Sequence, residues 1–224
     1  MSALLETVEH ETGPQPQWSV LWLHGLGADG HDFAPIVPEL VRREWPALRF
    51  VFPHAPVMPI TLNNGHAMRA WYDIVSLDFS KVREDAAGVR RSIAEVDALV
   101  ARERDRGVPA NRVVLAGFSQ GGAVTLAAGL RREQPLLGLV ALSAYLPLAA
   151  ETPLEATPGG LATPVFMAHG TQDPVVPWAA GQKSADALKA WGMDVALRRY
   201  PMPHSVCAEE IRDLGDWLTV RFAG

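Results

Sequence analysis

The chain has 224 residues, 48% of them hydrophobic, and carries a formal net charge of -5 at pH 7. This length and apolar content suffice for one sizeable core, so we expect a single domain over residues 1–224. The basic residues are scattered among acidic ones instead of forming a stripe, which argues against a nucleic-acid-binding surface.

The sequence lacks the usual signals for secretion or membrane insertion. Residues 1–11 carry three glutamates and neither lysine nor arginine, unlike the basic start of a secretory signal. The uncharged stretch at residues 136–150 is too short to span a bilayer and is interrupted by Pro147. One cysteine, Cys207, cannot form an internal disulfide. We therefore expect a cytoplasmic protein without a transmembrane segment, and a Cys207 thiol that is buried and chemically idle.

The chain begins with a polar, proline-containing lead over residues 1–17. A continuous apolar run at residues 18–23 then predicts a buried strand. This strand runs into His24-Gly25-Leu26-Gly27, where small residues leave the backbone N–H groups unshielded by large side chains. Glycine clusters are most often ordinary loops, but a position after the first long strand of an α/β chain favours a functional one.

The next segments predict one helix, one strand and a long connection. Residues 32–45 carry apolar side chains at three- and four-residue spacings, which predicts a helix, and residues 48–52 predict a strand. Prolines then hold residues 53–70 out of regular structure, so we expect a long loop, a kind of segment that is often functional. Trp71 follows this loop, and its type fits a place in the core and a place in a pocket wall equally well.

The rest of the chain alternates between strands and helices. Ser80 is a candidate cap for a helix that ends near residue 106, and a strand begins at about Arg112. Later strands are expected at residues 139–143, 165–169 and 195–200, and helices at residues 179–191 and 206–222, with a proline- and glycine-rich excursion at residues 147–164. Such alternation predicts a mainly parallel sheet with helices on both faces, in which ligands bind at the carboxyl ends of the strands.

One motif lies at such a strand end. Gly117-Phe118-Ser119-Gln120-Gly121 follows a β-branched apolar run and precedes a segment of small residues with helical character. A serine on a tight strand-to-helix turn needs nearly side-chain-free residues two before and two after it, and Gly117 and Gly121 supply them. The pattern therefore predicts a nucleophile elbow with Ser119 as the nucleophile.

A serine nucleophile needs a base, and the base needs an acid. In this sheet architecture the partners follow in the order serine, acid, histidine, which leaves His169 and His204 as candidate bases. His204 follows the last strand, is held by neighbouring prolines and directly precedes the final helix, so it is the predicted base, and His169 becomes a structural residue at its strand end. Asp173, four residues past a strand end, is the predicted acid; the alternative is an Asx-turn or a helix cap.

Two backbone N–H groups are needed to stabilise the negative charge that develops on the substrate oxygen. The residue after the nucleophile, Gln120, is the first predicted donor, and Leu26 is our choice for the second within the glycine-rich loop. The histidines are scattered and a phosphate loop or dinucleotide fingerprint is absent from the sequence, so we expect no metal and no cofactor.

Six segments in a fixed order carry a resemblance to a known family: His24-Gly25-Leu26-Gly27, Ala70-Trp71-Tyr72-Asp73, Gly117-Phe118-Ser119-Gln120-Gly121-Gly122, His169-Gly170, Asp173-Pro174-Val175-Val176-Pro177 and His204-Ser205. Together they resemble the motifs of the phospholipase/carboxylesterase family of small α/β-hydrolases, which includes bacterial carboxylesterases and eukaryotic acyl-protein thioesterases. The similarity covers almost the whole chain after the lead and is loosest at residues 147–164.

The resemblance implies an α/β-hydrolase fold with a mainly parallel central sheet, helices on both faces and no large cap domain. Carried over residue by residue, it makes Ser119, Asp173 and His204 the catalytic triad and Leu26 and Gln120 the oxyanion donors. It also implies that Trp71 and Val176 lie near the acyl pocket.

We therefore expect a serine esterase that cleaves short- to medium-chain carboxylic esters through an acyl-serine intermediate, with access controlled by the loops at residues 53–70 and 147–164. The alternative is an acyl-protein thioesterase or lysophospholipase with the same triad. A second alternative is a non-catalytic binding protein of the same fold, against which the order of nucleophile, acid and base argues. The expected partner is a small-molecule or lipid acyl ester or thioester, and the chain is expected to be a monomer or a homodimer.

Overall fold

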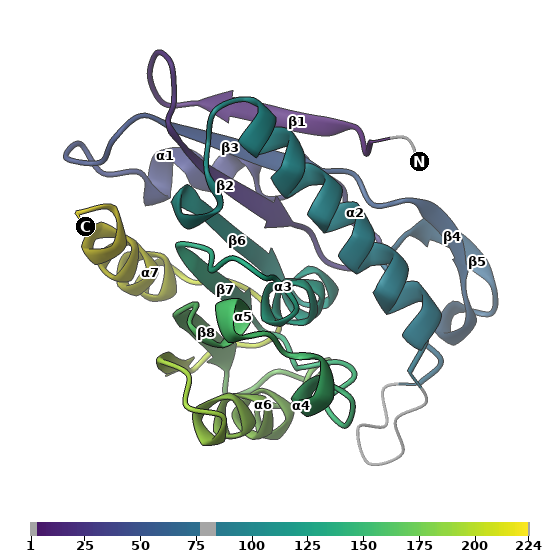
Figure 1. Cartoon of the computed structure of the whole chain (residues 1–224). Helices are drawn as coiled ribbons and strands as arrows, with labels where there is room; N and C mark the ends of the chain where they lie inside the picture. The colour runs from purple at the N-terminus through teal and green to yellow at the C-terminus, as the bar shows by residue number, and fades with distance from the viewer. Residues whose placement is uncertain (1–3, 77–83, 224) are drawn as a thin grey trace.

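The structure, a computed structural model, describes residues 4–76 and 84–223. Within these residues the main sheet contains the strands β1 (Thr7–Glu11), β2 (Trp18–Leu23), β3 (Leu48–Pro53), β6 (Val113–Phe118), β7 (Gly138–Leu142), β8 (Val165–Gly170) and β9 (Val195–Tyr200). Their spatial order is β1-β3-β2-β6-β7-β8-β9, and every neighbouring pair except β1 and β3 is parallel (Figure 1). The predicted mainly parallel sheet is confirmed.

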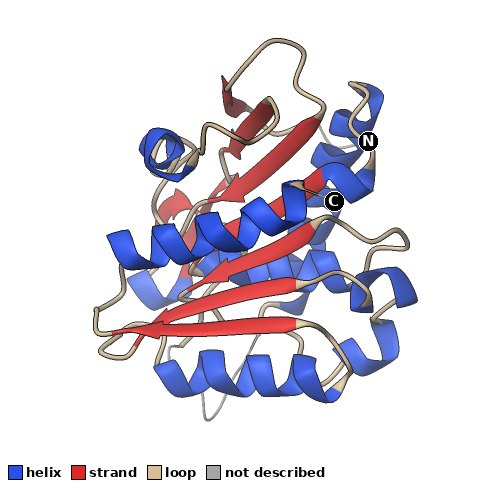
Figure 2. Cartoon of the chain, turned by 90° about the vertical axis from the view of Figure 1, so that its left-hand side faces the viewer, coloured by secondary structure: helices blue, strands red, loops and turns tan. Residues whose placement is uncertain are grey.

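Helices cover both faces of the sheet (Figures 1 and 2). They are α1 (Val37–Leu40), α2 (Ala86–Asp105), α3 (Gln120–Leu130), α6 (Trp178–Ala190) and α7 (Ala208–Phe222), with the single turns α4 (Thr152–Glu155) and α5 (Pro158–Leu161) in the excursion. Strand residues alternate between the two sides: Leu21 and Leu23 on β2 pack into one apolar cluster with α2, α3 and α6, whereas Val20 and Trp22 pack into a second cluster with α1 and α7. Among the described residues, no helix is long and apolar enough to cross a bilayer.

The expected loop at residues 53–70 contains regular structure, which corrects the sequence expectation. Strands β4 (Val57–Ile60) and β5 (His66–Arg69) pair as an antiparallel hairpin outside the main sheet. A 3-10 turn, η2 (Thr61–Asn63), leads into Asn64 and Gly65, whose φ angles of 54° and 77° are left-handed. The Asn-Gly pair was the available hairpin signal, because these two residue types adopt that conformation most easily.

Two predicted helix boundaries also need correction. The helix expected over residues 32–45 is only a 3-10 turn, η1 (Ala34–Ile36), followed by α1, because the backbone becomes extended at Val41, with φ -66° and ψ 136°. Helix α2 begins at Ala86 and is capped by Asp85, whose side chain accepts a hydrogen bond from the Gly88 N–H at 2.9 Å. Ser80, the predicted cap, lies outside the described residues.

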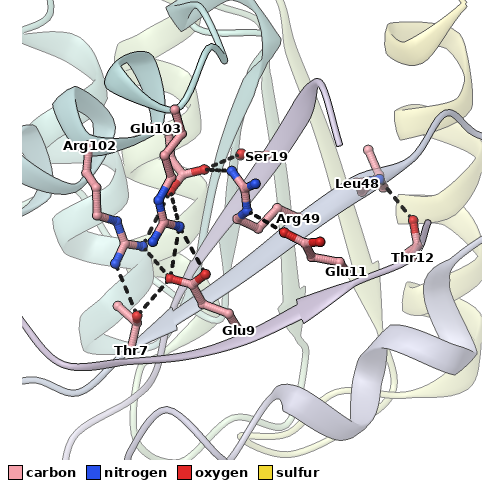
Figure 3. A network of polar contacts seen from close by, with 10 residues as sticks. Thr7, Glu9, Glu11, Thr12, Ser19, Leu48, Arg49, Arg102 and Glu103 are labelled. Carbon is pink, nitrogen blue, oxygen red and sulfur yellow. Dashed lines mark hydrogen bonds and ion pairs between the residues drawn. The ribbon is translucent and has the colours of Figure 1, made fainter. Parts of the chain in front are cut away.

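The predicted lead contains an edge strand, β1, that is tied to the sheet by charge. Glu103 on α2 is fully buried, and its carboxylate accepts hydrogen bonds from the Ser19 hydroxyl at 2.7 Å and from the Arg49 guanidinium at 3.0 Å (Figure 3). Arg102 on α2 pairs in turn with Glu9 on β1 at 2.9 Å. We call this cluster the Glu103 network; it lies at the amino ends of β2 and β3. The polar strand β1 lacked the apolar alternation by which a strand is recognised in a sequence.

The strand order places two segments side by side at one end of the sheet. The chain direction across the sheet changes between β2 and β6, which are neighbours, and such a switch point leaves a crevice beyond the carboxyl ends of the strands. The glycine-rich loop after β2 and the elbow after β6 therefore meet there.

Candidate active site

The elbow serine is held in a backbone conformation that ordinary residues avoid. Ser119, between β6 and α3, has φ 54° and ψ -120°, and its N–H donates to the Leu142 carbonyl at 2.8 Å. A Cβ atom on Gly117 would lie 2.4 Å from the Gly121 backbone, and one on Gly121 would lie 2.3 Å from the Leu23 carbonyl oxygen. Both glycines are therefore required for the turn to pack against its neighbours, as the sequence predicted.

The three residues predicted as nucleophile, base and acid lie within hydrogen-bond distance of one another. The His204 Nε2 atom is 2.9 Å from the Ser119 hydroxyl, and the His204 Nδ1 atom is 2.6 Å from an Asp173 carboxylate oxygen. The Asp173 side chain is fully buried, whereas that of His204 is 16% exposed. Because the carboxylate can only accept a hydrogen bond when ionised, it fixes the proton on Nδ1 and leaves the Nε2 lone pair directed at the serine.

The loop after β8 holds the acid in place. The second carboxylate oxygen of Asp173 accepts hydrogen bonds from the Val175 and Val176 N–H groups at 2.8 and 2.9 Å. The Val176 carbonyl in turn accepts a hydrogen bond from His169 Nε2 at 2.7 Å. Burial lowers the pKa of His169, so this ring is kept neutral. His169 thus supports the loop, in agreement with its predicted structural part.

The two predicted oxyanion donors flank Ser119. Gln120 is the first residue of α3, where backbone N–H groups point out of the helix without intrahelical partners. In the glycine-rich loop after β2, which we call the facing loop, the Gly27 N–H donates to the Arg69 carbonyl at 2.9 Å and the Ala28 N–H donates to the Gly25 carbonyl at 3.3 Å. The Leu26 N–H has no protein partner among the described residues. Leu26 and Gln120 therefore retain free backbone donors next to the nucleophile.

The side chain of Gln120 has a second contact that the sequence did not reveal. Its carbonyl oxygen accepts a hydrogen bond from the Trp71 N–H at 2.8 Å, and its amide donates to the Tyr72 carbonyl at 2.7 Å. Because Gln120 is only 2% exposed, both bonds are sheltered from water. The residue after the nucleophile thus ties α3 to the segment that follows β5.

His24 and Trp71 support the facing loop from inside the protein. The His24 Nε2 atom accepts a hydrogen bond from the Ala55 N–H at 3.0 Å, so Nδ1 carries the proton and donates to the Gly25 carbonyl at 2.7 Å. Burial lowers the pKa of His24 and keeps the ring in this neutral form. The Trp71 indole N–H donates to the His24 carbonyl at 2.8 Å. Sequence reasoning missed these supporting contacts, which depend on residues far apart in the chain.

The two residues predicted near the acyl pocket are both buried. Trp71 has no exposed surface and belongs to the apolar cluster under α2, and Val176 is 4% exposed. Their observed contacts are with the facing loop and with Asp173, respectively. A direct contact of either residue with substrate stays a prediction.

A largely apolar cavity of about 480 Å³ lies beside the acid loop. Its wall contains Tyr145 and Leu146 after β7, Pro177 after Val176, and Ala180 on α6. Two charged side chains, Glu84 and Lys183, also reach it. Small alanines from α6 and from residues 149–150 leave this space open.

The Cys207 thiol is less buried than the sequence analysis predicted. Cys207 is the N-cap residue of α7 and is only partly buried, which corrects the expectation of a fully buried thiol. Within residues 4–76 and 84–223, no group of three or more histidine, cysteine, aspartate or glutamate side chains could hold a metal ion.

Comparisons with known proteins give a consistent result over almost the whole chain. The family model described as Phospholipase/Carboxylesterase matches residues 5–221. "Acyl-protein thioesterase 1" of Mycosarcoma maydis is 40% identical and is aligned over 94% of each chain, and the protein of the same name from Neurospora crassa is 43% identical over 91% of this chain and 86% of its own length. The crystal structure of Arabidopsis thaliana SOBER1 superposes with a TM-score of 0.87 at 32% identity, over 91% of this chain and 98% of that one.

Proposed function

Because the chain belongs to the phospholipase/carboxylesterase family, we propose that it is a serine esterase whose catalytic triad is Ser119, His204 and Asp173. The observation that supports this most directly is the unbroken hydrogen-bond path from the Ser119 hydroxyl through both His204 nitrogens to the Asp173 carboxylate. Such a path is what a serine needs to act as a nucleophile near neutral pH.

In the first half-reaction, the Ser119 oxygen bonds to the carbonyl carbon of an ester or thioester as its proton passes to His204 Nε2. The negative charge moves to the former carbonyl oxygen, where the Leu26 and Gln120 N–H groups stabilise it. The bond to the alcohol or thiol then breaks, and the leaving group takes the proton from His204.

In the second half-reaction, a water molecule gives a proton to His204 and attacks the acyl carbon. The acyl–oxygen bond to Ser119 breaks, the serine recovers its proton from His204, and the carboxylic acid leaves. Throughout, the Asp173 carboxylate stabilises the His204 cation, and two backbone hydrogen bonds to its second oxygen hold it in place.

We assign the acyl group of the substrate to the apolar cavity beside the acid loop. Each buried CH₂ group contributes about 0.8 kcal/mol to binding, so a cavity of this kind selects substrates by chain length. Filling it with Ala180→Phe should shift the preference toward shorter acyl chains, whereas the conservative Ala180→Val should change it less. Turnover of a panel of aryl esters of increasing chain length measures the shift, and identical chain-length profiles would exclude this cavity as the acyl site.

An acyl-protein thioesterase activity is the second candidate, because the relatives at 40% and 43% identity carry that name. The same residues would act, and only the leaving group would differ. Turnover of short-chain aryl esters should be compared with that of a peptide carrying a long-chain thioester. A higher kcat/KM for the thioester would favour this second reading.

The enzyme assignment itself is tested by a fluorophosphonate probe, which reacts with activated serines. We expect the probe to label the wild-type protein at neutral pH and to leave Ser119→Ala unlabelled. Wild-type protein that is folded and unlabelled would favour the non-catalytic binding protein.

A further inference from the structure

Glu210 is a buried acid that the proposed chemistry does not use. It lies in the first turn of α7, close in sequence to His204, and none of its surface is exposed. Among the described residues neither carboxyl oxygen has a hydrogen bond of good geometry, and the donor that acts on the carboxyl is the Cys207 backbone N–H. An ionised carboxylate without a partner is strongly disfavoured in an apolar interior, so Glu210 is held there as the neutral acid.

Local effects on this carboxyl oppose each other, and burial is the largest. Burial favours the neutral form and raises the pKa of Glu210 to about 8. The start of a helix and the nearby Cys207 backbone N–H favour the ionised form to a smaller extent. Within the described residues, no cation offsets the effect of burial.

The groups that face Glu210 supply no positive charge. From β9 comes Tyr200, whose pKa is raised by burial and also by Glu210, and whose hydroxyl donates to Asp213 on α7 at 2.7 Å. On α7 itself the titratable residues nearest in sequence are Glu209, Arg212 and Asp213, and none of them is among the causes of the raised pKa of Glu210. The other elements packed against α7, β8 and α1, contribute apolar side chains to the shared cluster, and Arg42 beyond α1 pairs with Asp216.

Glu210 also lies at one of the two anchors of the turn that carries His204. At the upstream anchor, the Met202 carbonyl accepts a hydrogen bond from the Gln172 N–H at 3.1 Å, which ties the turn to the end of β8. At the downstream anchor the chain enters α7 at Cys207, and this residue packs against the apolar cluster under the helix.

Between the anchors, the Ser205 N–H donates to the Pro203 carbonyl at 2.9 Å, a contact internal to the turn. The His204 ring packs against Phe118, with 4.7 Å between ring centroids. The first turn of α7 is therefore the downstream attachment of the turn that carries the imidazole.

We propose that Glu210 is a positioning residue for the base: as an uncharged acid it keeps the first turn of α7 packed, and its ionisation loosens that turn and displaces His204 from Ser119. The proton is released to bulk water. This inference rests on the proposed function, because it takes His204 as the base. It also explains why an acid so close in sequence to His204 does not compete with Asp173 for the imidazolium.

The consequence is a loss of activity in the alkaline range. A serine hydrolase whose base must be neutral gains activity as pH rises past the pKa of that base and then reaches a plateau. Here kcat should fall again with a midpoint near pH 8, the pKa of Glu210, by about tenfold per pH unit above it. Because the acyl cavity is not involved, KM should change little.

The test measures kcat and KM for a soluble aryl ester between pH 6 and 10, corrected for spontaneous hydrolysis. Glu210→Gln, which is neutral at every pH, should keep kcat within a factor of about three of the wild type at pH 7 and should lose the alkaline fall. The matched controls are Glu209→Gln, the exposed neighbour, and Cys207→Ser, which removes the only cysteine. Both should keep the alkaline fall. A Glu210→Gln profile that falls with the wild-type midpoint would overturn the proposal.

Two further measurements keep the test decisive if Glu210→Gln does not fold. Glu210→Met fills a similar volume without a titratable group and should also give a flat alkaline profile. For the wild type alone, the rate at which the fluorophosphonate labels Ser119 should fall above pH 8. If the probe labels the wild type equally fast at pH 7 and pH 9, the proposed role of Glu210 is refuted and the proposed function is not. If the probe never labels the wild type, the proposed function is refuted.

Discussion

The two ends of the sheet each contain a buried carboxylate, but the partners of these two carboxylates differ. At the amino end, the Glu103 carboxylate is surrounded by cations: Arg49 lies 3.0 Å away, Arg106 3.2 Å and Arg102 3.4 Å (Figure 3). At the carboxyl end, the partners of the Asp173 carboxylate within the described part of the chain are backbone N–H groups and imidazoles.

This difference separates a structural from a catalytic use of a buried carboxylate. Permanent cations surround Glu103, and ion pairs of this region join β1, β3 and α2 (Figure 3). In the proposed mechanism, the partner of Asp173 gains and loses a proton, so the Asp173 carboxylate stabilises the His204 cation only when the reaction forms it. Substitutions at the two ends should therefore affect different quantities, stability at the amino end and turnover at the carboxyl end.

The largest effect is expected from Ser119→Ala. Removal of the nucleophile should lower turnover by on the order of 10⁴- to 10⁶-fold, since the remaining residues cannot form the acyl-enzyme. The midpoint of thermal unfolding should not fall, because the strained φ of 54° suits alanine no worse than serine. A large loss of stability with unchanged turnover would contradict the expectation that substitutions at the carboxyl end of the sheet affect turnover and not stability.

Glu103→Gln should have the converse effect. Removing one partner of a buried ion pair typically costs about 3–5 kcal/mol of unfolding free energy, because the arginines remain without a counter-charge. Turnover per folded molecule should stay near the wild-type value. Glu11→Gln is the matched control, because Glu11 pairs with the same Arg49 but is 46% exposed, and it should cost about 1 kcal/mol or less. Urea denaturation measures both unfolding free energies. Equal losses for the two variants would contradict the idea that burial determines how much an ion pair contributes to stability.

Leu26→Pro tests the second oxyanion donor. The substitution deletes the backbone N–H and should lower kcat by about 10²- to 10³-fold in protein that remains folded. Leu26→Ala keeps that N–H and removes only the side chain, so its kcat should stay close to that of the wild type. Similar kcat values for a folded proline variant and the alanine variant would show that a different loop residue is the donor.

Glu210 adds a pH dependence of stability to the catalytic end. Its folded-state pKa of about 8 is above its ordinary value of 4.5, so between these limits the folded state holds a proton that the unfolded chain releases. The unfolding free energy should therefore fall as pH rises through this window, with a contribution of up to about 1.4 kcal/mol per pH unit. Glu210→Gln should remove that contribution and Glu209→Gln should not. Urea denaturation at pH 5 to 8 gives the unfolding free energy as a function of pH. Parallel curves for the Glu210→Gln variant and the wild type would refute this contribution of Glu210.

The smallest effect is expected for a charge pair in neither region. Arg90 on α2 pairs with Glu151 and Glu155 on the surface, and the Arg90 side chain is 46% exposed. Solvent and salt screen such pairs, so Arg90→Ala should change the unfolding free energy very little and should leave kcat unchanged. A loss as large as that of Glu103→Gln would mean that exposure does not distinguish these ion pairs.

The sequence alone determined the sheet architecture and the order of the chemical groups. The continuous apolar run of residues 18–23 and the glycines around Ser119 are local signals, because each reflects the conformation of a few neighbouring residues. The resemblance of six ordered segments then pointed to the family, which the family model over residues 5–221 confirms.

Only the tertiary structure revealed the features that depend on contacts between residues far apart in the chain. The helix expected at residues 32–45 ends at Leu40, and a hairpin at residues 57–69 takes the place of an expected loop. The hydrogen bond between the Trp71 N–H and the Gln120 side chain and the ion pair between Arg49 and Glu103 both join residues far apart in the chain. Spacing along a sequence reports which backbone conformations are favourable, but a side chain's burial and partners depend on segments that meet only when the sheet forms. For that reason the sequence predicted a set of catalytic groups, while only the fold revealed the buried acid at Glu210.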